Sequence, residues 1–363
     1  MTVAPSRDRR ERLDPHVFDL PFEKMRDGYY SDAYFNHTRA ALLHDGRRPR
    51  VVMQLFQRHN AMLGGMDESI AILELCSHDW PGLTVHALRD GDRVEPWDTV
   101  MTIEGDYTSF GHLETVVLGT LARRTLIATN TASVLEAANG KPIIFMPARH
   151  DHHRVQTGDG YAAHVAGAVL GAEIGVTSDA QASWWGGRGV GTVPHSLIAA
   201  YGGNTVLAAT KFAEWAPEDF HITVLVDFEN DSVGTALEVA RALGPRLWGV
   251  RLDTSSQLVD RSLWGELGDF TPTGVNERLV RNLRDALDAA GHEAVRIVVS
   301  GGFTVDKIRA FEARGVPVDA YGIGSSLIRG SNDFTADIVV TDGEPSAKVG
   351  RRLRPNPRLE LVT

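Results

Sequence analysis

The sequence has very little cysteine and no long apolar run, and each absence excludes a class of protein. Cys76, within AILELC, is the only cysteine, so no internal disulfide can form, and we expect its thiol to fill core space. No stretch approaches the roughly 20 apolar residues that cross a bilayer. The first residues, MTVAPSRDRRERLDPHVFDLP, are charged but precede no apolar segment, which predicts neither a signal peptide nor a membrane anchor. These features favour the reducing cytoplasm.

Basic charge is also scarce. The formal net charge is −10 and the sequence pI is about 5.8. This balance argues against binding nucleic acid or an anionic membrane surface, so basic residues are expected to matter only locally. With 363 residues, 43% of them hydrophobic, the chain is long enough for one large domain or two ordinary ones with sizeable cores.

Residues 1–140 have the pattern of a mixed α/β domain. We expect a loose polar arm over 1–16, and a packed apolar face for the aromatic residues of 22–35. The patterns then predict a strand at 50–56, a helix at 68–76 and antiparallel strands in 83–111. A long alanine-rich helix should follow from about 112 to 139, where Asn139-Gly140 ends it.

From residue 141 to 330 short apolar strands alternate with helices, which is typical of parallel strands joined by crossover helices. Seven such units suggest a closed β/α barrel, one strand short of eight, with an open doubly wound sheet as the alternative. The tail, 331–363, is polar and strand-like, and we expect it to return to the first domain. The expected strands are 142–146, 173–176, 189–192, 222–227, 248–253, 295–300 and 318–323; the expected helices are 160–170, 180–185, 195–201, 205–214, 233–243, 276–290 and 305–314.

The stretch GVGTVPHSLIAAYGG, residues 189–203, contains the first candidate catalytic residue. Its glycine-containing start predicts a strand and a turn, and Pro194-His195-Ser196 then opens an apolar helical run. His195 would therefore lie near a helix N-terminus, where an anion such as phosphate is favoured. A histidine after a proline is more often a solvated or capping residue, so the case for His195 depends on its neighbours.

Polar residues follow every predicted barrel strand, at the end where barrel active sites lie. The last two strands end in the glycine turns SGGF (300–303) and GIGSS (322–326), each expected to open a helix, and we interpret these turns as a phosphate site. Asp227 and Asp253 end the strands ITVLVD and WGVRLD, where carboxylates suit ribose hydroxyls or Mg²⁺. His150-Asp151-His152-His153 lacks metal-ligand spacing, and we expect a polar loop there.

Together these motifs resemble the nicotinate phosphoribosyltransferase family, the barrel-type (type II) phosphoribosyltransferases of NAD biosynthesis. Each motif is weak alone, but eight in the same order are specific. They are SDAYF for the D-x-Y segment, LGTLARRTLIATNTA for the long helix, MPARH for G-x-R-R, IGVTSD for T-S-N, GTVPHS for G-T-x-x-H, GVRLDT for R-L-D-S, and VVSGGF and YGIGSSL for the two phosphate turns.

The resemblance implies an α/β fold in which an N-terminal α/β sandwich, completed by the C-terminal tail, accompanies an incomplete β/α barrel. It also implies a homodimer with shared active sites, because an N-terminal tyrosine of one subunit completes its neighbour's site. The implied reaction joins nicotinate to phosphoribosyl pyrophosphate, giving nicotinate mononucleotide and pyrophosphate. ATP hydrolysis drives it through a transient phosphohistidine, and Mg²⁺ holds the pyrophosphate.

Carried over to this sequence, the family's motifs assign a role to each matching residue. His195 would be phosphorylated, Asp227 would hold Mg²⁺ and pyrophosphate, and Asp253 would bind the ribose hydroxyls. Tyr34 would stack on the pyridine ring and Arg149 would bind the nicotinate carboxylate or nearby phosphates. Thr177, Ser178 and Thr192 would line the same pocket, and Ser300, Gly301, Gly302, Gly322, Gly324 and Ser325 would bind the 5′-phosphate.

The sequence departs from the family pattern at three places. Thr254-Ser255-Ser256 stands where Ser-Gly-Asp is usual, His150 replaces the second arginine of R-R, and Asp179 replaces the asparagine of T-S-N. Two alternatives therefore stay open: a related phosphoribosyltransferase that uses quinolinate or nicotinamide, and a barrel that binds phosphate without turnover.

Overall fold

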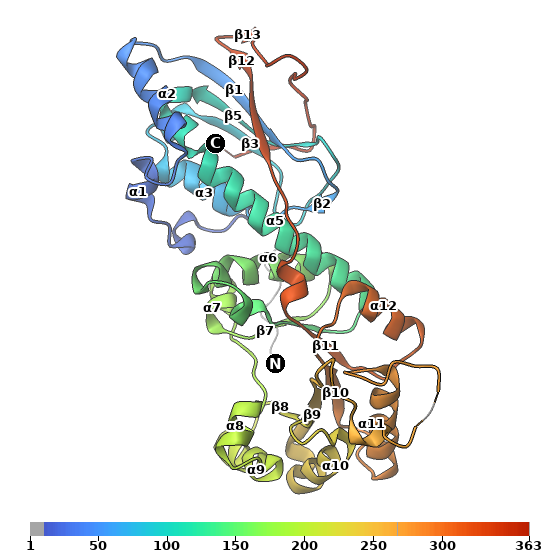
Figure 1. The fold of residues 1–363 in the computed structure, drawn as a ribbon. Coiled ribbons are helices and arrows are strands. Elements are labelled where there is room, and N and C mark those ends of the chain that lie inside the picture. Colours follow the sequence, from blue (N-terminus) through green and yellow to red (C-terminus); the bar gives the residue numbers. More distant parts are fainter. Residues whose placement is uncertain (1–10, 267, 363) are drawn as a thin grey trace. The chain divides into compact units, whose positions relative to one another are not determined.

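The computed structural model describes residues 11–266 and 268–362, which form two compact units, drawn in Figure 1. The first unit contains the described residues up to Ala132, Tyr161–Leu170, and those from Gly330 onward. The second contains Ser133–Gly160 and Gly171–Arg329. Among the described helices, none combines the length and apolar character that a bilayer crossing requires.

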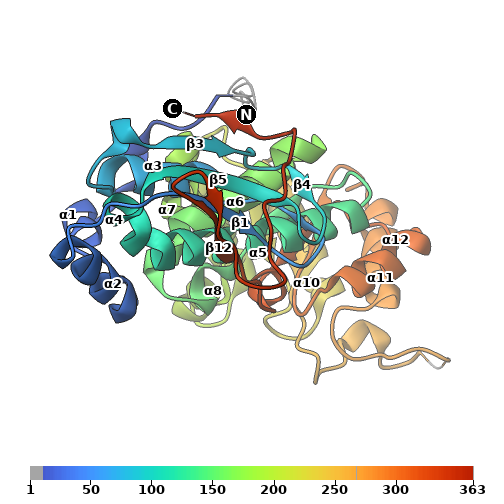
Figure 2. The ribbon, with the colours of Figure 1, turned by 90° about the horizontal axis from the view of Figure 1, so that it is seen from above.

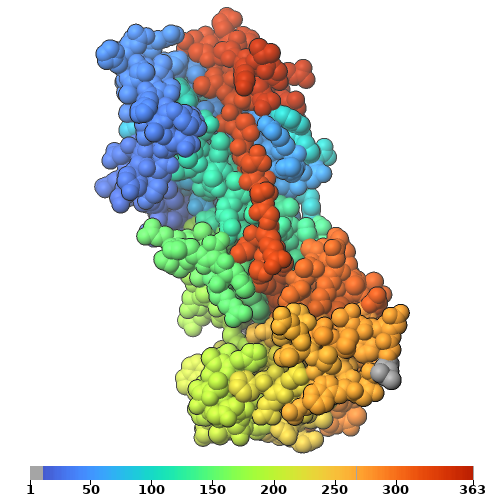
Figure 3. Space-filling view, in the orientation of Figure 1, coloured from blue at the N-terminus to red at the C-terminus, as the bar shows by residue number. Residues whose placement is uncertain are grey.

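The first unit is built on a six-stranded sheet in the order β13-β12-β1-β5-β3-β14. Both flanks of this sheet include strands of the C-terminal tail, since β12 pairs antiparallel with β1 and β14 pairs with β3, as Figure 2 shows from above. The tail, red in Figure 3, therefore completes the sheet as the sequence predicted. The strands are β1 (Arg50–Phe56), β3 (Thr84–Ala87), β5 (Thr99–Asp106), β12 (Thr335–Thr341), β13 (Glu344–Pro345) and β14 (Glu360–Leu361), with β2 (Ala61–Met62) and β4 (Arg93–Val94) forming a separate pair.

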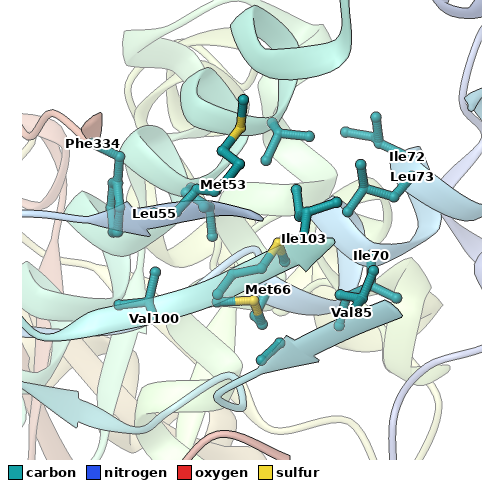
Figure 4. Close-up of a cluster of buried hydrophobic side chains, with 14 of the residues drawn as sticks. Met53, Leu55, Met66, Ile70, Ile72, Leu73, Val85, Val100, Ile103 and Phe334 are labelled. Atoms are coloured by element: carbon teal, nitrogen blue, oxygen red, sulfur yellow. The ribbon is translucent and has the colours of Figure 1, made fainter. Parts of the chain in front are cut away.

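The core of the first unit is formed by alternate residues of the strands and by one face of helix α3. Met53, Leu55 and Ile103 pack with Ile70 and Leu73 of α3 (Figure 4). Strand residues with period two and helix residues spaced three or four apart account for this core. The helical segments are η1 (Pro15–Phe18), α1 (Phe22–Arg26), α2 (Ala33–His44), α3 (Met66–Cys76), η2 (Trp80–Gly82), α4 (Tyr107–Phe110), η3 (Gly111–Leu113) and α5 (Glu114–Ala137).

Several expectations for the first unit are confirmed. The strand at β1, the helix at α3 and the long helix α5 form, and Cys76 is fully buried. Asn139 and Gly140, with φ of 51° and 83°, follow the end of α5 in the left-handed conformation.

Two other expectations are wrong. Arg12 is not part of a loose arm, because its guanidinium is 2.8 Å from the buried carboxylate of Asp67; residues 1–10 of that prediction lie outside the described part of the chain. The aromatic residues of 22–35 do not form a packed face. Tyr29, Tyr30 and Tyr34 are 72%, 39% and 60% exposed; the first two lie in the turn before α2, and α2 itself, which carries Tyr34, buries no residue.

His112 is an unusual polar member of the first unit's interior. It is 2% exposed, and neither ring nitrogen has a hydrogen-bond partner within residues 11–266 and 268–362. The ring of His78 lies 5.1 Å away, centroid to centroid. Burial lowers the pKa of His112 to about 4, and positive charge on the nearby His78 and Arg39 side chains contributes to this shift.

We expect this histidine to make the first unit sensitive to acid. The unfolded chain binds a proton at this position below a pH of about 6.5, whereas the folded chain does so only near 4, so stability is lost as the pH falls through that window. Between pH 7 and 4.5, the free energy of unfolding should fall by about 2 kcal/mol less in His112→Phe than in the native protein. Urea unfolding at both pH values, followed by circular dichroism, measures it; equal acid losses in the two proteins would contradict the prediction.

The second unit is a curled sheet of six parallel strands in the order β7-β6-β11-β10-β9-β8. This order is that of a barrel, because the first strands in the chain pair with the last, β6 with β11. The strands are β6 (Ile143–Phe145), β7 (Ile174–Val176), β8 (Ile222–Leu225), β9 (Leu247–Leu252), β10 (Arg296–Val299) and β11 (Ala320–Ile323). The helical segments are η4 (Pro147–His150), η5 (His153–Val155), α6 (Gln156–Leu170), α7 (Asp179–Ala182), η6 (Ser183–Trp185), α8 (His195–Ala200), α9 (Thr205–Trp215), α10 (Ser232–Leu243), η7 (Gly244–Arg246), η8 (Arg261–Leu263), α11 (Glu277–Ala289), α12 (Val305–Ala313) and η9 (Ser325–Ile328).

The predicted strand at 189–192 is wrong, and its absence leaves the barrel incomplete. The segment forms no ladder. It donates one hydrogen bond from Val190 to Val176 at the end of β7, and Val193 forms a single bridge to Val224 of β8. Gly189 and Gly191 weaken a strand here, because glycine has no side chain to pack. The segment thus joins the two open edges of the sheet by isolated bonds, which accounts for an irregular barrel rather than a closed one.

Candidate active site

The candidate site is built where four neighbouring parallel strands end. Strands β8, β9, β10 and β11 lie side by side, and each is followed by polar or glycine residues. Asp227 comes after β8, Asp253 after β9, Ser300 after β10 and Gly324 after β11. Since parallel strands place their carboxyl ends at one edge, these residues gather there.

His195 and Asp227 form a hydrogen-bonded pair at this edge. Nε2 of His195, the first residue of α8, lies 3.0 Å from Oδ1 of Asp227. The carboxylate is only 6% exposed and the imidazole 43%. The hydrogen bond to Asp227 raises the pKa of His195, with the negative charges of Asp227 and Asp253 adding to it, although burial and Arg251 oppose the change. Because the carboxylate can only accept, the pair orients the imidazole with a proton on Nε2.

Arg251 connects this pair to Asp253. Its Nη1 donates to Oγ1 of Thr192 over 3.2 Å, and its Nη2 lies 3.9 Å from Oδ2 of Asp253. Its Nε is buried and has no hydrogen-bond partner among the described residues; burial lowers the pKa of the guanidinium, the negative charges of Asp253 and Asp227 raise it, and the positive charge of Arg149 lowers it. From the sequence, Arg251 had no assigned role beyond its place in the GVRLDT motif; its alternation with buried Val250 and Leu252 in β9 was the available signal.

Asp253 in turn contacts the first glycine turn. Its Oδ1 accepts a hydrogen bond of 2.9 Å from Oγ of Ser300. Gly301 and Gly302 have φ of 83° and 76°, and a Cβ on Gly301 would lie 3.2 Å from that same carboxylate oxygen. Glycine is therefore needed here both for the left-handed backbone and for the close carboxylate.

The second glycine turn uses its glycines differently. Neither Gly322 nor Gly324 has a positive φ. A Cβ on Gly322 would lie 2.7 Å from Cε of Met146, and one on Gly324 would lie 2.9 Å from Nε2 of His150. These glycines make room for side chains that follow β6. The turn then leads into η9, a 3-10 helix of four residues.

The remaining predicted residues are distributed between the two units. Thr177 and Ser178 are engaged locally: the side chain of Gln181 accepts hydrogen bonds from both their backbone N–H groups, and Ser178 caps α7. Arg149 is exposed, near enough to affect the pKa of Arg251. Tyr34 belongs to the first unit, where its hydroxyl donates to Asp32 over 3.3 Å.

The carboxylates could hold a metal only with help from a ligand. No cluster of three or more His, Cys, Asp and Glu suited to a metal occurs among the described residues. Asp227 has one carboxylate oxygen beyond the one that binds His195, and Asp253 lies nearby. Magnesium is often held by one or two carboxylates plus substrate phosphates, so this donor set fits Mg²⁺ bound together with a pyrophosphate.

The sequence of this chain is similar to those of known phosphoribosyltransferases. Residues 32–125 match the family described as "Quinolinate phosphoribosyl transferase, N-terminal domain". Nicotinate phosphoribosyltransferase pncB1 of Mycobacterium tuberculosis is 33% identical over 268 residues, covering 71% of this chain and 54% of that protein. The nicotinate phosphoribosyltransferase of Bacillus subtilis is 24% identical over 246 residues, covering 67% of this chain and 45% of that protein.

Solved structures share the fold over most of the chain. Nicotinate-nucleotide pyrophosphorylase from Pyrococcus furiosus superposes with a TM-score of 0.78 at 30% identity, covering 94% of this chain and 85% of that one. Human nicotinic acid phosphoribosyltransferase superposes with a TM-score of 0.67 at 18% identity, covering 87% of this chain and 76% of that one, which shows the fold alone.

Proposed function

Because the chain belongs to the nicotinate phosphoribosyltransferase family, we propose that it joins nicotinate to phosphoribosyl pyrophosphate in NAD salvage. The products are nicotinate mononucleotide and pyrophosphate. The chain spans about half the length of the curated relatives it matches, so activity, substrates and partners are all part of the proposal.

One observation supports this proposal above all: interacting polar side chains form a continuous row along the edge of the sheet. The imidazole of His195 binds Asp227, Arg251 lies between Thr192 and Asp253, and Asp253 accepts from Ser300 at the glycine turn. Such a row can bind a sugar between a phosphate at one end and a pyrophosphate at the other.

The proposed roles follow the charges that the reaction develops. As the bond from the ribose carbon to pyrophosphate breaks, positive charge grows on the ribose and negative charge on the leaving group. Asp253 lies where it can bind the ribose hydroxyls and stabilise the positive charge. The two glycine turns, through Ser300, Gly301, Gly302, Gly322, Gly324 and Ser325, bind the 5′-phosphate, and Asp227 holds Mg²⁺, which neutralises the pyrophosphate.

The base pocket is proposed from residues beside this row. Arg149 binds the nicotinate carboxylate or a nearby phosphate, and Thr192, Thr177 and Ser178 line the pocket. Tyr34 stacks on the pyridine ring of the partner subunit's site in a homodimer. Its 60% exposure, with exposed Tyr29 and Tyr30 nearby in the chain, supports a surface that another copy covers.

ATP coupling is proposed to act through His195. With Nε2 bonded to Asp227, the Nδ1 atom has no partner in the described part of the chain, and it can accept the γ-phosphoryl group of ATP while ADP leaves. The phosphorylated histidine would tighten binding of phosphoribosyl pyrophosphate, and its hydrolysis would then release product.

Quinolinate is the second candidate base. The match of residues 32–125 to the quinolinate phosphoribosyltransferase family and the similarity to the Pyrococcus furiosus pyrophosphorylase favour it. A dicarboxylate needs two cationic contacts, and Arg149 and Arg251, whose charges lie close enough to interact, could supply them.

A screen of pyridine bases tests the proposal. Pyrophosphate release from phosphoribosyl pyrophosphate and Mg²⁺ is measured with nicotinate, nicotinamide or quinolinate, each with and without ATP. We expect turnover with nicotinate, stimulated by ATP. Carbon dioxide release with quinolinate would identify the second candidate instead, and sugar phosphate binding without turnover of any base would identify a non-catalytic barrel.

A further inference from the structure

His150 lies directly against the backbone of the second glycine turn. Strands β6 and β11 are parallel neighbours, with Phe145 opposite Ile323, and the backbone N–H of Met146 donates to the carbonyl of Ile323 over 2.7 Å. This pairing brings η4 beside the residues that follow β11. The imidazole then reaches the turn, with Nε2 2.9 Å and Cδ2 3.3 Å from the position that a Cβ of Gly324 would take.

The glycine at 324 leaves room for this imidazole. Its backbone, with φ of −103° and ψ of −116°, lies outside the usual helical and extended regions, and this also favours glycine. A Cβ at this position would lie 2.9 Å from Nε2, so any other residue would force the ring to shift. Two segments distant in the sequence therefore meet at one point of the turn.

The imidazole is also available for a ligand. It is exposed, and neither ring nitrogen has a partner within the described residues. Its surroundings suit an anion: Arg149 precedes it in η4, and Oγ of Ser325 follows Gly324, 3.5 Å from Nη2 of Arg329. A histidine N–H and a serine hydroxyl are hydrogen-bond donors to phosphate oxygens.

We propose that His150 binds the 5′-phosphate of the sugar substrate at the Gly324-Ser325 turn, as a residue that determines phosphate affinity. This inference rests on the proposed function for the identity of the sugar, and it deepens that function by adding a side chain from η4 to the phosphate site. The matched family motif has arginine at this position, so the imidazole supplies a shorter donor that fits over Gly324.

Binding of two fragments of the substrate tests this assignment. Ribose 5-phosphate carries only the 5′-phosphate, and inorganic pyrophosphate carries only the leaving group, so calorimetric titration of each with the full chain separates the two anion sites. We expect His150→Ala to weaken ribose 5-phosphate binding about tenfold to hundredfold, the effect of losing a charged hydrogen bond, and to leave pyrophosphate binding unchanged. His153→Ala, an exposed histidine of the same segment, should change neither.

A double-mutant cycle tests whether the contact with Gly324 is responsible. Gly324→Ala places a methyl group 2.9 Å from Nε2 and also strains the backbone of the turn, so it should weaken ribose 5-phosphate binding more in the native background than in His150→Ala. His150→Arg should restore binding toward the native value. Unchanged ribose 5-phosphate affinity in His150→Ala, an equal loss of pyrophosphate affinity, or additive effects in the cycle would each overturn the assignment. Because no base is present, a failed base screen would leave this result interpretable.

Discussion

Replacing Asp253 by asparagine is expected to lower kcat/KM for phosphoribosyl pyrophosphate by about 10²–10³-fold, the usual effect of removing one preorganised electrostatic group. Asparagine keeps the size of the side chain, and its Oδ1 can still accept from Ser300, so the turn should stay in place. What is lost is the negative charge beside the ribose and beside the guanidinium of Arg251. Steady-state kinetics with varied phosphoribosyl pyrophosphate measures the effect.

A matched control separates chemistry from folding for this variant. Asp285 is an exposed carboxylate on α11 with no role in the proposed site, and Asp285→Asn should leave kcat/KM unchanged. Thermal unfolding should shift little in Asp285→Asn, since surface substitutions away from special contacts change stability by about 0.5 kcal/mol or less, and the retained hydrogen bond from Ser300 should limit the shift in Asp253→Asn. If Asp253→Asn kept full activity, Asp253 would have no part in stabilising the transition state.

The second large effect concerns His195. We expect His195→Ala to abolish ATP-stimulated turnover and to leave slow, ATP-independent synthesis, because the sugar and phosphate contacts of Asp253 and Ser300 do not involve the imidazole. Asp227→Asn should give a partial loss of ATP stimulation, since the amide still occupies the place of the carboxylate but no longer offsets the positive charge that phosphorylation of Nδ1 would place on the ring. Product formation with and without ATP, together with acid-labile labelling from ATP, measures both.

The test compares the stimulation by ATP with the ATP-independent rate in the same variant. His153→Ala is the control, and it should keep the full stimulation by ATP. Loss of neither activity in His195→Ala would remove the residue from the mechanism. Loss of both to the same extent would instead indicate that the imidazole only maintains the site's structure.

Local sequence signals predicted most of the second unit. Short apolar runs such as ITVLVD and WGVRLD became β8 and β9, and the polar residues that end them lie at one edge because parallel strands align their carboxyl ends. The helices expected at 180–185 and 276–290 begin within one residue of the predicted positions, where Ser178 caps α7 and Asn276 caps α11.

Signals that depended on tertiary contacts failed or were missed. The glycine-containing stretch 189–192 looked like a strand, but it meets β7 and β8 through isolated bonds only. Tyr29, Tyr30 and Tyr34 looked like a packed face and are exposed. Arg251 was given no role from the sequence, yet it lies between Thr192 and Asp253 within the site.

The sequence by itself determined the strands, the helix ends and the residue types at each strand end, because these follow from side-chain periodicity and local hydrogen bonding. Only the tertiary structure decided which distant residues meet: β6 beside β11, the His195 imidazole on Asp227, and the His150 imidazole over Gly324. The physical reason is that such pairs form when separate segments pack into the same space, and no local pattern specifies which segments those are.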